Sequence, residues 1–395
     1  MSTTTSVTAS EAAARAREIV PQLRERAAQT ALDRRLPLSN IEALRESGSL
    51  KTVQATRNGG FALGIRSHLD VMSTLGRGCG STAWVAGVVH AHSWLVSHFP
   101  EQGQDDVYRD NPDAIVSAVI GPRGKATRTA DGYHLEGVWP FGSGSERADW
   151  LLLGGVVFDD DGNELDQGDF MVPASSVTIK DDWYVSGLAG TGSCTMVVPG
   201  VEVPAHRFLS LPALIMGNSP GEELHGNDWV QRCAPVPVLT IALCGGAIGI
   251  AKQALEDFPA GIKGKVIAYT ADPQEPHPFT HIRLGDAASR IREGELLLYA
   301  IADDLDAAAQ ANTEVPLLRR AEMRNDCATA VRRLLEGVEI LFRESGATGV
   351  RTSSPMNRAL ADIQTINNHG LLKLETNQEM YGRLLLGLEP NTPLI

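Results

Sequence analysis

The chain has 395 residues, more than one compact hydrophobic core normally holds, so we expect two or three domains. Its formal net charge is -13, and the acidic residues are dispersed along the chain, which argues against a nucleic-acid surface and against adhesion to anionic membranes. The five cysteines are scattered and form no C-x-x-C pair, which argues against a disulfide framework and a structural zinc site.

The sequence shows no sorting or membrane signal. No apolar run reaches the length of a membrane span, and the first twenty residues lack the hydrophobic core of a secretion signal. We therefore expect a cytoplasmic protein with no metal site, no nucleic-acid partner and no membrane partner.

The first hundred residues have a helical pattern. Thr8 and Glu11 have the spacing of a capping box, and an Ala-, Arg- and Glu-rich segment follows them. A longer apolar segment, Ser81–Leu95, carries small residues that allow close helix packing. His92 follows Trp84 by eight residues, so a helix places both on one face.

From about Pro112 the pattern changes to short strands and turns. Asp131-Gly132 separates two strand-like runs and predicts a β-hairpin. Asp161-Gly162 predicts a second turn, after the strand Trp150–Phe158. Further strands are expected at Gly168–Pro173, Val177–Asp182 and Thr195–Val203. Together they predict a small antiparallel β domain, a sandwich or barrel.

From about Asp228 to the end the pattern is helical again. Long segments with apolar residues at helical spacing predict a helix bundle. The expected helices cover Ile241–Phe258, His281–Asp304 and Arg324–Arg343. The fold class is therefore α+β and mostly α, with a helical domain over residues 1–112, a β domain over 113–220 and a four-helix bundle over 221–395.

The stretch Trp139–Trp150 (WPFGSGSERADW) gathers aromatic rings, glycines and serines between two predicted strands. Rings that wall a site, with small hydroxyls between them, suit a planar ligand, and glycine lets the backbone approach closely. The alternative is an aromatic-rich strand and turn inside an ordinary β core.

A second glycine-rich segment, Trp183–Ser193 (WYVSGLAGTGS), follows another predicted strand. Its backbone N–H groups and hydroxyls could hold the edge of a ring or a phosphate, and the alternative is a plain loop. The sequence has no G-x-G-x-x-G segment that opens a helix, no G-x-x-x-x-G-K-[ST] and no H-E-x-x-H, so Rossmann, P-loop and zinc-protease sites have no support.

In this order these pieces resemble the acyl-CoA dehydrogenase fold superfamily, whose members consist of a helical domain, a β domain and a four-helix bundle. In that family a W-x-x-S-type segment and a G-x-x-G-T-x-S segment hold the flavin ring. Trp139–Ser143 and Gly187–Ser193 stand in those places, and Val203–Arg207 resembles the exit from the β domain.

The segment Pro355–Gly370 indicates which branch of the superfamily the chain resembles. Dehydrogenases of this fold commonly carry a glutamate base here, but the chain keeps only the aspartate, Asp362, and has Asn368 and His369 at the base position. A histidine at this place is typical of two-component (group D) flavin-dependent monooxygenases. The chain is therefore similar to the oxygenase components of 4-hydroxyphenylacetate and phenol hydroxylases.

The resemblance implies an oxygenase that takes reduced flavin, FMN or FAD, from a separate flavin reductase. With O2 the flavin forms a C4a-hydroperoxide that hydroxylates a small aromatic or cyclic substrate, and water must be excluded. Ser143 would hydrogen-bond at flavin N5, His369 would act in acid–base chemistry near neutral pH, and His92 would polarise a phenol. Members of the family commonly form homotetramers.

The resemblance also assigns binding residues by position. The expected cofactor contacts are Trp139, Phe141, Ser143, Gly190, Thr191 and Ser193. The expected substrate contacts are Trp84, His92 and Ser117. Lys265 is a candidate for the distal end of the flavin.

Three alternative functions stay open at the sequence level. The same chemistry could oxygenate nitrogen or sulfur, because one oxidant serves all three atoms. The chain could be a dehydrogenase-like desaturase with a base elsewhere, such as Glu256 or Glu344. It could also be a non-catalytic flavin-binding protein, in which His369 and His92 are structural.

Overall fold

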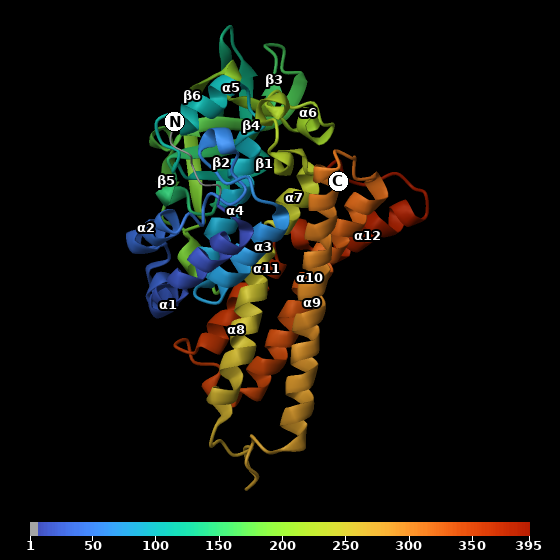
Figure 1. The fold of residues 1–395 in the computed structure, drawn as a ribbon. Coiled ribbons are helices and arrows are strands. Elements are labelled where there is room, and N and C mark those ends of the chain that lie inside the picture. Colours follow the sequence, from blue (N-terminus) through green and yellow to red (C-terminus); the bar gives the residue numbers. More distant parts are fainter. Residues whose placement is uncertain (1–6) are drawn as a thin grey trace.

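A computed structural model describes residues 7–395 of the chain and shows helices, then a sheet, then a second group of helices (Figure 1). The first group of helices is α1 (Ala9–Asp33), α2 (Leu38–Glu46), α3 (Ile65–Gly76), α4 (Gly80–Val96) and α5 (Glu101–Tyr108). The strands are β1 (Val116–Arg128), β2 (Gly132–Gly142), β3 (Trp150–Phe158), β4 (Glu164–Pro173), β5 (Thr178–Lys180), β6 (Cys194–Pro204) and β7 (Phe208–Ser210). The second group is α6 (Leu211–Ile215), α7 (Pro235–Ile241), α8 (Gly245–Ile262), α9 (Pro278–Gln310), α10 (Leu317–Glu344), α11 (Pro355–Asn367) and α12 (Leu374–Leu385).

The mostly helical α+β class is confirmed, and several local predictions hold. Thr8 and Glu11 form the predicted capping box at the start of α1. The strand predicted at Trp150–Phe158 is β3 itself, and Arg128 pairs with Tyr133 across the predicted hairpin turn. The exact limits of the three domains stay a prediction.

The sheet corrects the expectation of an antiparallel β domain. Seven strands form one mixed sheet in the order β5-β6-β2-β1-β3-β4-β7, and β1 and β3 are parallel. The other neighbouring pairs are antiparallel. The chain therefore builds a single seven-stranded sheet.

The parallel pair follows from the path of the segment between β2 and β3. Strand β2 returns antiparallel to β1, and residues 143–149 then cross the first end of β1, so that β3 starts beside it and runs in the same direction. The backbone N–H groups of Asp149 and Trp150 bond to the carbonyl oxygen of Ile115, and the Ile115 N–H bonds to the Asp149 carboxylate. The crossing segment is the stretch that the sequence marks as a ligand site.

The long helices α8, α9, α10 and α11 form the bundle, which extends away from the sheet in Figure 1. Close packing of α9 against α10 depends on glycine. A Cβ on Gly294 would lie 2.7 Å from the Ala330 carbonyl oxygen, and one on Gly337 would lie 2.7 Å from the Ile291 side chain. The hydrophobic core continues from these helices through α4 to β1.

One segment corrects the statement that no apolar run reaches membrane-spanning length. Residues Pro235–Ile262, which include α7 and α8, have a mean hydropathy of 1.6 over their most apolar window. In the fold 83% of that window is buried, as expected for a core helix of the bundle.

Cysteines and possible metal ligands add no further site. All five cysteines are buried and free. Across residues 7–395, no three histidine, cysteine, aspartate or glutamate side chains gather in an arrangement that could hold a metal ion.

Candidate active site

Helix α4 is the centre of the candidate site. All of its residues are buried except Trp84, which is only half-buried. The indole Nε1–H of Trp84 donates to the hydroxyl oxygen of Ser143 at 3.0 Å. This bond joins α4 to the stretch that follows β2. It places an expected substrate contact, Trp84, next to an expected cofactor contact, Ser143.

The two glycine-rich segments of the sequence meet at a chain of hydroxyl groups. The Ser143 and Ser193 hydroxyl oxygens are 2.7 Å apart, and those of Ser193 and Thr191 are also 2.7 Å apart. The Thr191 hydroxyl donates to the carbonyl oxygen of Leu188 at 2.8 Å. Ser143, Thr191 and Ser193 are therefore brought together as predicted, although they come from different segments.

Glycines allow both segments to reach α4. Gly144 has a φ of +71°, and a Cβ there would lie 2.8 Å from the Val85 side chain. A Cβ on Gly190 would lie 2.5 Å from the Thr30 side chain and 3.1 Å from that of Ser81. Gly190 thus supports the close approach of the backbone, and its placement among the cofactor contacts stays a prediction.

His369 follows α11 directly and faces Trp84, with the two ring centroids 5.7 Å apart. Its Nδ1 accepts a bond from the Leu371 backbone N–H at 3.3 Å, so in the neutral ring the proton is on Nε2. Burial lowers the pKa of His369 to about 4. In this state the ring is therefore a neutral hydrogen-bond donor at pH 7, and its part in acid–base chemistry stays a prediction.

His92 lies on α4 opposite the first residues of β1. Its Nδ1 is 3.0 Å from the carbonyl oxygen of Val116, which can only accept, so the proton of the neutral ring is on Nδ1. Burial lowers the pKa of His92 to about 4, although the bond to Val116 opposes this effect. Its Nε2 is left with a free lone pair among residues 7–395. Ser117, which follows Val116 in β1, donates its hydroxyl to the Ser143 carbonyl oxygen at 2.8 Å.

Asp362 joins the three parts that carry these side chains. Its carboxylate accepts the Leu188 backbone N–H at 2.6 Å, and Gly80 at the start of α4 comes so close that a Cβ there would lie 2.5 Å from it. Gly187 packs against Ala361 in the same way. Burial raises the pKa of Asp362 to about 6. The sequence marks this aspartate only through the resemblance, and its contacts between distant segments are visible only in the fold.

Two of the predicted cofactor contacts lie outside this cluster. Trp139 is fully buried in the core of the sheet, and its indole N–H donates to the Gly154 carbonyl oxygen at 2.7 Å. It has no free face for a ligand, so the structure contradicts its expected role as a wall of the site. Phe141 is exposed, with a φ of +72°, and its ring is 6.1 Å from that of Trp183. Sequence analysis assigns no role to Trp183, although it stands at the start of the second glycine-rich segment.

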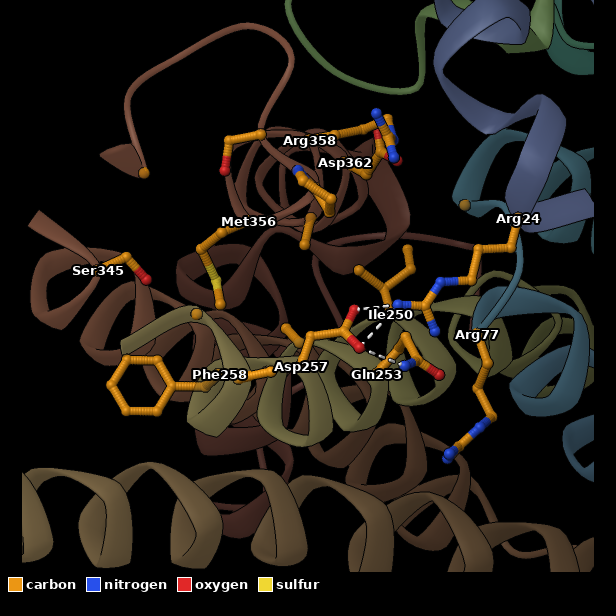
Figure 2. A pocket seen from close by; sticks show the side chains of 18 of the residues that line it. Arg24, Arg77, Ile250, Gln253, Asp257, Phe258, Ser345, Met356, Arg358 and Asp362 are labelled. Carbon is orange, nitrogen blue, oxygen red and sulfur yellow. Dashed lines mark hydrogen bonds and ion pairs between the residues drawn. The ribbon is translucent and has the colours of Figure 1, made fainter. Parts of the chain in front are cut away.

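A cavity of about 390 Å³ is lined in part by Asp362, which also contacts the cluster, and by residues of α8 and α11 (Figure 2). Arg24 of α1 reaches across it to Asp257 of α8, with both oxygens at 2.7 Å. Lys265 also lines the cavity and bonds to the Thr348 hydroxyl at 2.7 Å, and Arg358 of α11 lies next to Asp362. The cavity therefore has a basic lining.

Comparison with known proteins defines the class to which this fold and site belong. Residues 241–373 match the family model described as acyl-CoA dehydrogenase, C-terminal domain. The crystal structure of the HsaA monooxygenase from Mycobacterium tuberculosis superposes with a TM-score of 0.92 at 30% identity and covers 98% of this chain and 100% of that one. XiaF from Streptomyces sp., solved with FADH2 and glycerol, superposes with a TM-score of 0.90 at 27% identity and covers 98% and 97% of the two chains. The class is a flavin monooxygenase with the acyl-CoA dehydrogenase fold.

The curated relatives narrow the class. The FADH2-dependent resorcinol hydroxylase oxygenase component of Rhizobium sp. strain MTP-10005 is 32% identical over 380 residues, which are 93% of this chain and 92% of that protein. The oxygenase subunit HsaA of Rhodococcus jostii strain RHA1 is 32% identical over 378 residues, 94% of this chain and 97% of that one. The chain belongs to the oxygenase components of two-component flavin-dependent monooxygenases, as the sequence resemblance implied.

Proposed function

We propose that Ser143, Trp84, His369 and His92 form the site at which this oxygenase uses reduced flavin and O2 to hydroxylate a small phenolic substrate. The observation that supports this most strongly is the contact of three distant segments at one point. Trp84 of α4 bonds to Ser143, which follows β2, and faces His369, which follows α11. A core built only for stability does not need a hydroxyl chain and a neutral histidine beside a half-buried indole.

The residues around Ser143 fit a flavin ring. Gly144 and Gly190 let both segments pack closely on α4 and α1, and this packing holds the hydroxyl chain, which provides hydrogen-bonding groups, next to Trp84. The exposed aromatic side chain of Phe141, held at an unusual positive φ, adds apolar area at the rim. When bound, the reduced flavin supplies the activation of O2, and the protein supplies binding, orientation and exclusion of water.

In this proposal His369 is a hydrogen-bond donor. Its Nδ1 is occupied by the Leu371 N–H, and the neutral ring offers Nε2–H. The Trp84 indole, which lies against the His369 imidazole, limits where that imidazole can lie. His369 therefore holds a proton at Nε2 for the oxygen that is transferred and leaves the charge of the site unchanged.

His92 is the acceptor on the substrate side. The bond from Nδ1 to Val116 fixes the tautomer and leaves the Nε2 lone pair for the hydroxyl proton of a phenol. Ser117 orients the adjacent backbone through its bond to the Ser143 carbonyl. A hydrogen bond from the phenolic hydroxyl to His92 pulls its proton away from the oxygen and raises the electron density of the ring, which favours attack on an electrophilic oxygen.

The basic cavity in Figure 2 is proposed to receive the phosphate-bearing tail of FAD or FMN, from the same chain or from a second copy. Lys265 and Arg358 are the cations expected to contact it, because Arg24 is already paired with Asp257. Lys265→Ala should weaken binding of FAD and FMN but not of riboflavin, which has no phosphate. Equal weakening of all three would contradict this assignment.

A flavin reductase is the expected partner, because family members receive flavin already reduced. We further propose a homotetramer in the cytoplasm. Five free thiols fit a reducing compartment, and the exposed apolar side chains of Val266, Tyr269, Phe279 and Ile282 at the end of the bundle fit a contact between subunits. The oligomeric state can be measured by light scattering.

The desaturase alternative has weaker support. Glu256, one of its candidate bases, is an exposed side chain paired with Arg77. Oxygenation of nitrogen or sulfur differs from phenol hydroxylation in the need for His92, since those substrates have no hydroxyl proton to withdraw. A panel of phenols, anilines and thioethers with His92→Gln separates these possibilities.

His369→Ala tests the proposed site. Hydroxylation per reduced flavin oxidised should fall by on the order of 10²-fold, as expected for loss of an acid–base group, while flavin binding changes little. His134→Ala is the matched control, because His134 is an exposed residue of β2 and its Nδ1 bonds to the exposed Glu202 carboxylate. Unchanged coupling in His369→Ala would show that its proposed role is wrong.

A further inference from the structure

The hydroxyl chain beside Ser143 has a fixed direction, which follows from counting its protons. The Leu188 carbonyl oxygen can only accept, so the Thr191 hydroxyl proton is used there at 2.8 Å. The Ser193–Thr191 contact of 2.7 Å then requires the proton of Ser193, because Thr191 has no other.

The same count continues to Ser143. Since Ser193 has donated to Thr191, the Ser143–Ser193 contact of 2.7 Å requires the proton of Ser143. At the other end the indole N–H of Trp84 can only donate, and it takes one lone pair of the Ser143 oxygen. Only this order, from Trp84 through Ser143, Ser193 and Thr191 to Leu188, gives every contact one proton.

The consequence is that Ser143 presents an acceptor only. Its proton points to Ser193, one lone pair is used by Trp84, and one lone pair remains for a ligand. Hydrogen bonds in such a chain polarise one another, which strengthens this direction. A ligand N–H is therefore accepted, whereas a ligand nitrogen with a lone pair meets an oxygen lone pair.

We propose that the Thr191–Ser193 hydroxyls, acting through Ser143, make this site selective for reduced over oxidised flavin. Reduced flavin carries N–H at N5, where oxidised flavin carries a lone pair. This inference rests on the proposed function, since it requires the flavin ring at Ser143. Thr191 and Ser193 are positioning residues in it, because they act by fixing the orientation of the Ser143 hydroxyl.

Two substitutions should release the Ser143 proton. Ser193→Ala removes its acceptor directly. Thr191→Val removes the acceptor of the Ser193 hydroxyl, so Ser193 can donate to Ser143 instead. The Ser143 proton is then free to donate to a ligand. In both variants Ser143 can rotate and donate to oxidised flavin, so the affinity for oxidised flavin should rise relative to that for reduced flavin.

The test measures dissociation constants of FAD and FMN in both redox states, with the reduced forms titrated anaerobically. The ratio of the oxidised to the reduced constant should fall by about tenfold in Ser193→Ala and Thr191→Val, as expected for one hydrogen bond. The midpoint potential of bound flavin should fall by about 30 mV, which is that tenfold change for a two-electron couple, because the oxidised form is bound relatively more tightly. Thr191→Ser, which keeps the hydroxyl, should retain the wild-type ratio.

Ser145→Ala is the matched control. Ser145 lies two residues from Ser143 and its hydroxyl is buried, but it has no hydrogen-bond partner among residues 7–395. Its ratio should equal that of the wild type. If Ser193→Ala and Thr191→Val fold normally and keep the wild-type ratio, or if Ser145→Ala changes it equally, the inference is wrong. If the wild type binds neither redox state, the proposed function fails with it.

Discussion

His90 and His92 lie two residues apart on α4 and differ in what their rings can do. Both are buried, and burial lowers the pKa of each to about 4. His90 has both nitrogens occupied, by the His68 Nδ1 at 2.9 Å and the Ser49 carbonyl oxygen at 2.6 Å. His92 has one nitrogen occupied, by Val116, and the other has no partner within residues 7–395.

The difference shows that neither burial nor a shifted pKa marks a functional histidine in this protein. His90 and His92 lie on different faces of α4, because residues two apart on a helix point in different directions. The two histidines therefore have different neighbours. The face with His90 packs on α3 through His68, and the face with His92 meets β1 beside the hydroxyl chain. The free nitrogen is the distinguishing feature.

Substitution of each histidine tests this comparison most strongly. His92→Gln should lower the turnover of a phenol by on the order of 10²-fold through loss of the acceptor for the phenolic hydroxyl. His90→Gln should leave turnover unchanged but cost about 1–3 kcal/mol of unfolding free energy, because it disturbs the bonds to His68 and Ser49. Turnover and denaturant unfolding of both variants give the result. Equal loss of turnover in the two would remove the distinction.

A pair of aspartates extends the comparison to the junctions between domains. Asp362 accepts the Leu188 N–H at the site, and Asp306 accepts the N–H groups of Ile65 and Arg66 at the start of α3. Burial raises the pKa of each to about 6. Asp362→Ala should lower coupling of flavin oxidation to hydroxylation by about tenfold through misplaced groups.

Asp306→Ala serves as the control for that prediction, with a comparable loss of stability and normal coupling. Asp362→Asn should recover much of the coupling, since the amide oxygen still accepts the Leu188 N–H. Product and peroxide measured per reduced flavin, with the melting temperature of each variant, separate the outcomes. Coupling that follows melting temperature alone would make Asp362 purely structural.

The dependence on pH gives a smaller expected effect. An ordinary histidine, with a pKa near 6.5, is half charged at pH 6.5. His92 and His369 stay neutral down to about pH 5. Turnover should therefore change less than about twofold between pH 8 and pH 6. Since the unfolded chain binds these protons near pH 6.5 and the folded chain only near pH 4, stability should fall as pH drops through that interval. Steady-state rates and thermal melts over the same range provide the measurement, and a rate that halves near pH 6.5 would contradict the assignment.

Asp169 should have no effect on turnover and a clear effect on stability. It is buried in β4, one of its oxygens has no partner among residues 7–395, and burial raises its pKa to about 7. Between about pH 4 and pH 7 the Asp169 carboxyl is therefore ionised in the unfolded chain but protonated in the folded one, so the free energy of unfolding falls as pH rises. Above about pH 7 the carboxyl is ionised in both states and the loss of stability is complete. Asp169→Asn should be more stable than the wild type by on the order of 3–4 kcal/mol at pH 8 and equal at pH 4. Denaturant unfolding at both pH values tests this, and equal stability at pH 8 would show that the carboxylate has a partner.

Much of the fold could be predicted from local signals. Turn dipeptides and helical spacing located the hairpin at Asp131-Gly132, strand β3 and the long helices. The parallel pairing of β1 and β3 could not be predicted, because the pattern of a strand does not identify its neighbour. The crossing segment at residues 143–149 holds only a short 3-10 helix, Ser145–Arg147, and lacks the long helix that usually joins parallel strands. Similarly, a single sequence does not show that α8 is covered by other helices.

The candidate site was predicted in part. The motifs identified Ser143, Thr191 and Ser193, and the structure brings them together. Trp139 was given the wrong environment, because an aromatic residue at a ligand motif and one in a sheet core have the same local sequence. The tautomers of His92 and His369 depend on backbone groups of other segments, which the sequence alone does not position.

A structure of the protein with bound reduced flavin tests the central claim most directly. The account predicts that the flavin ring lies at Ser143, with N5 within hydrogen-bonding distance of its hydroxyl, and that His369 and Trp84 border it. A flavin ring bound elsewhere, with the Ser143 hydroxyl and the free nitrogens of His92 and His369 facing only protein or solvent, would contradict it.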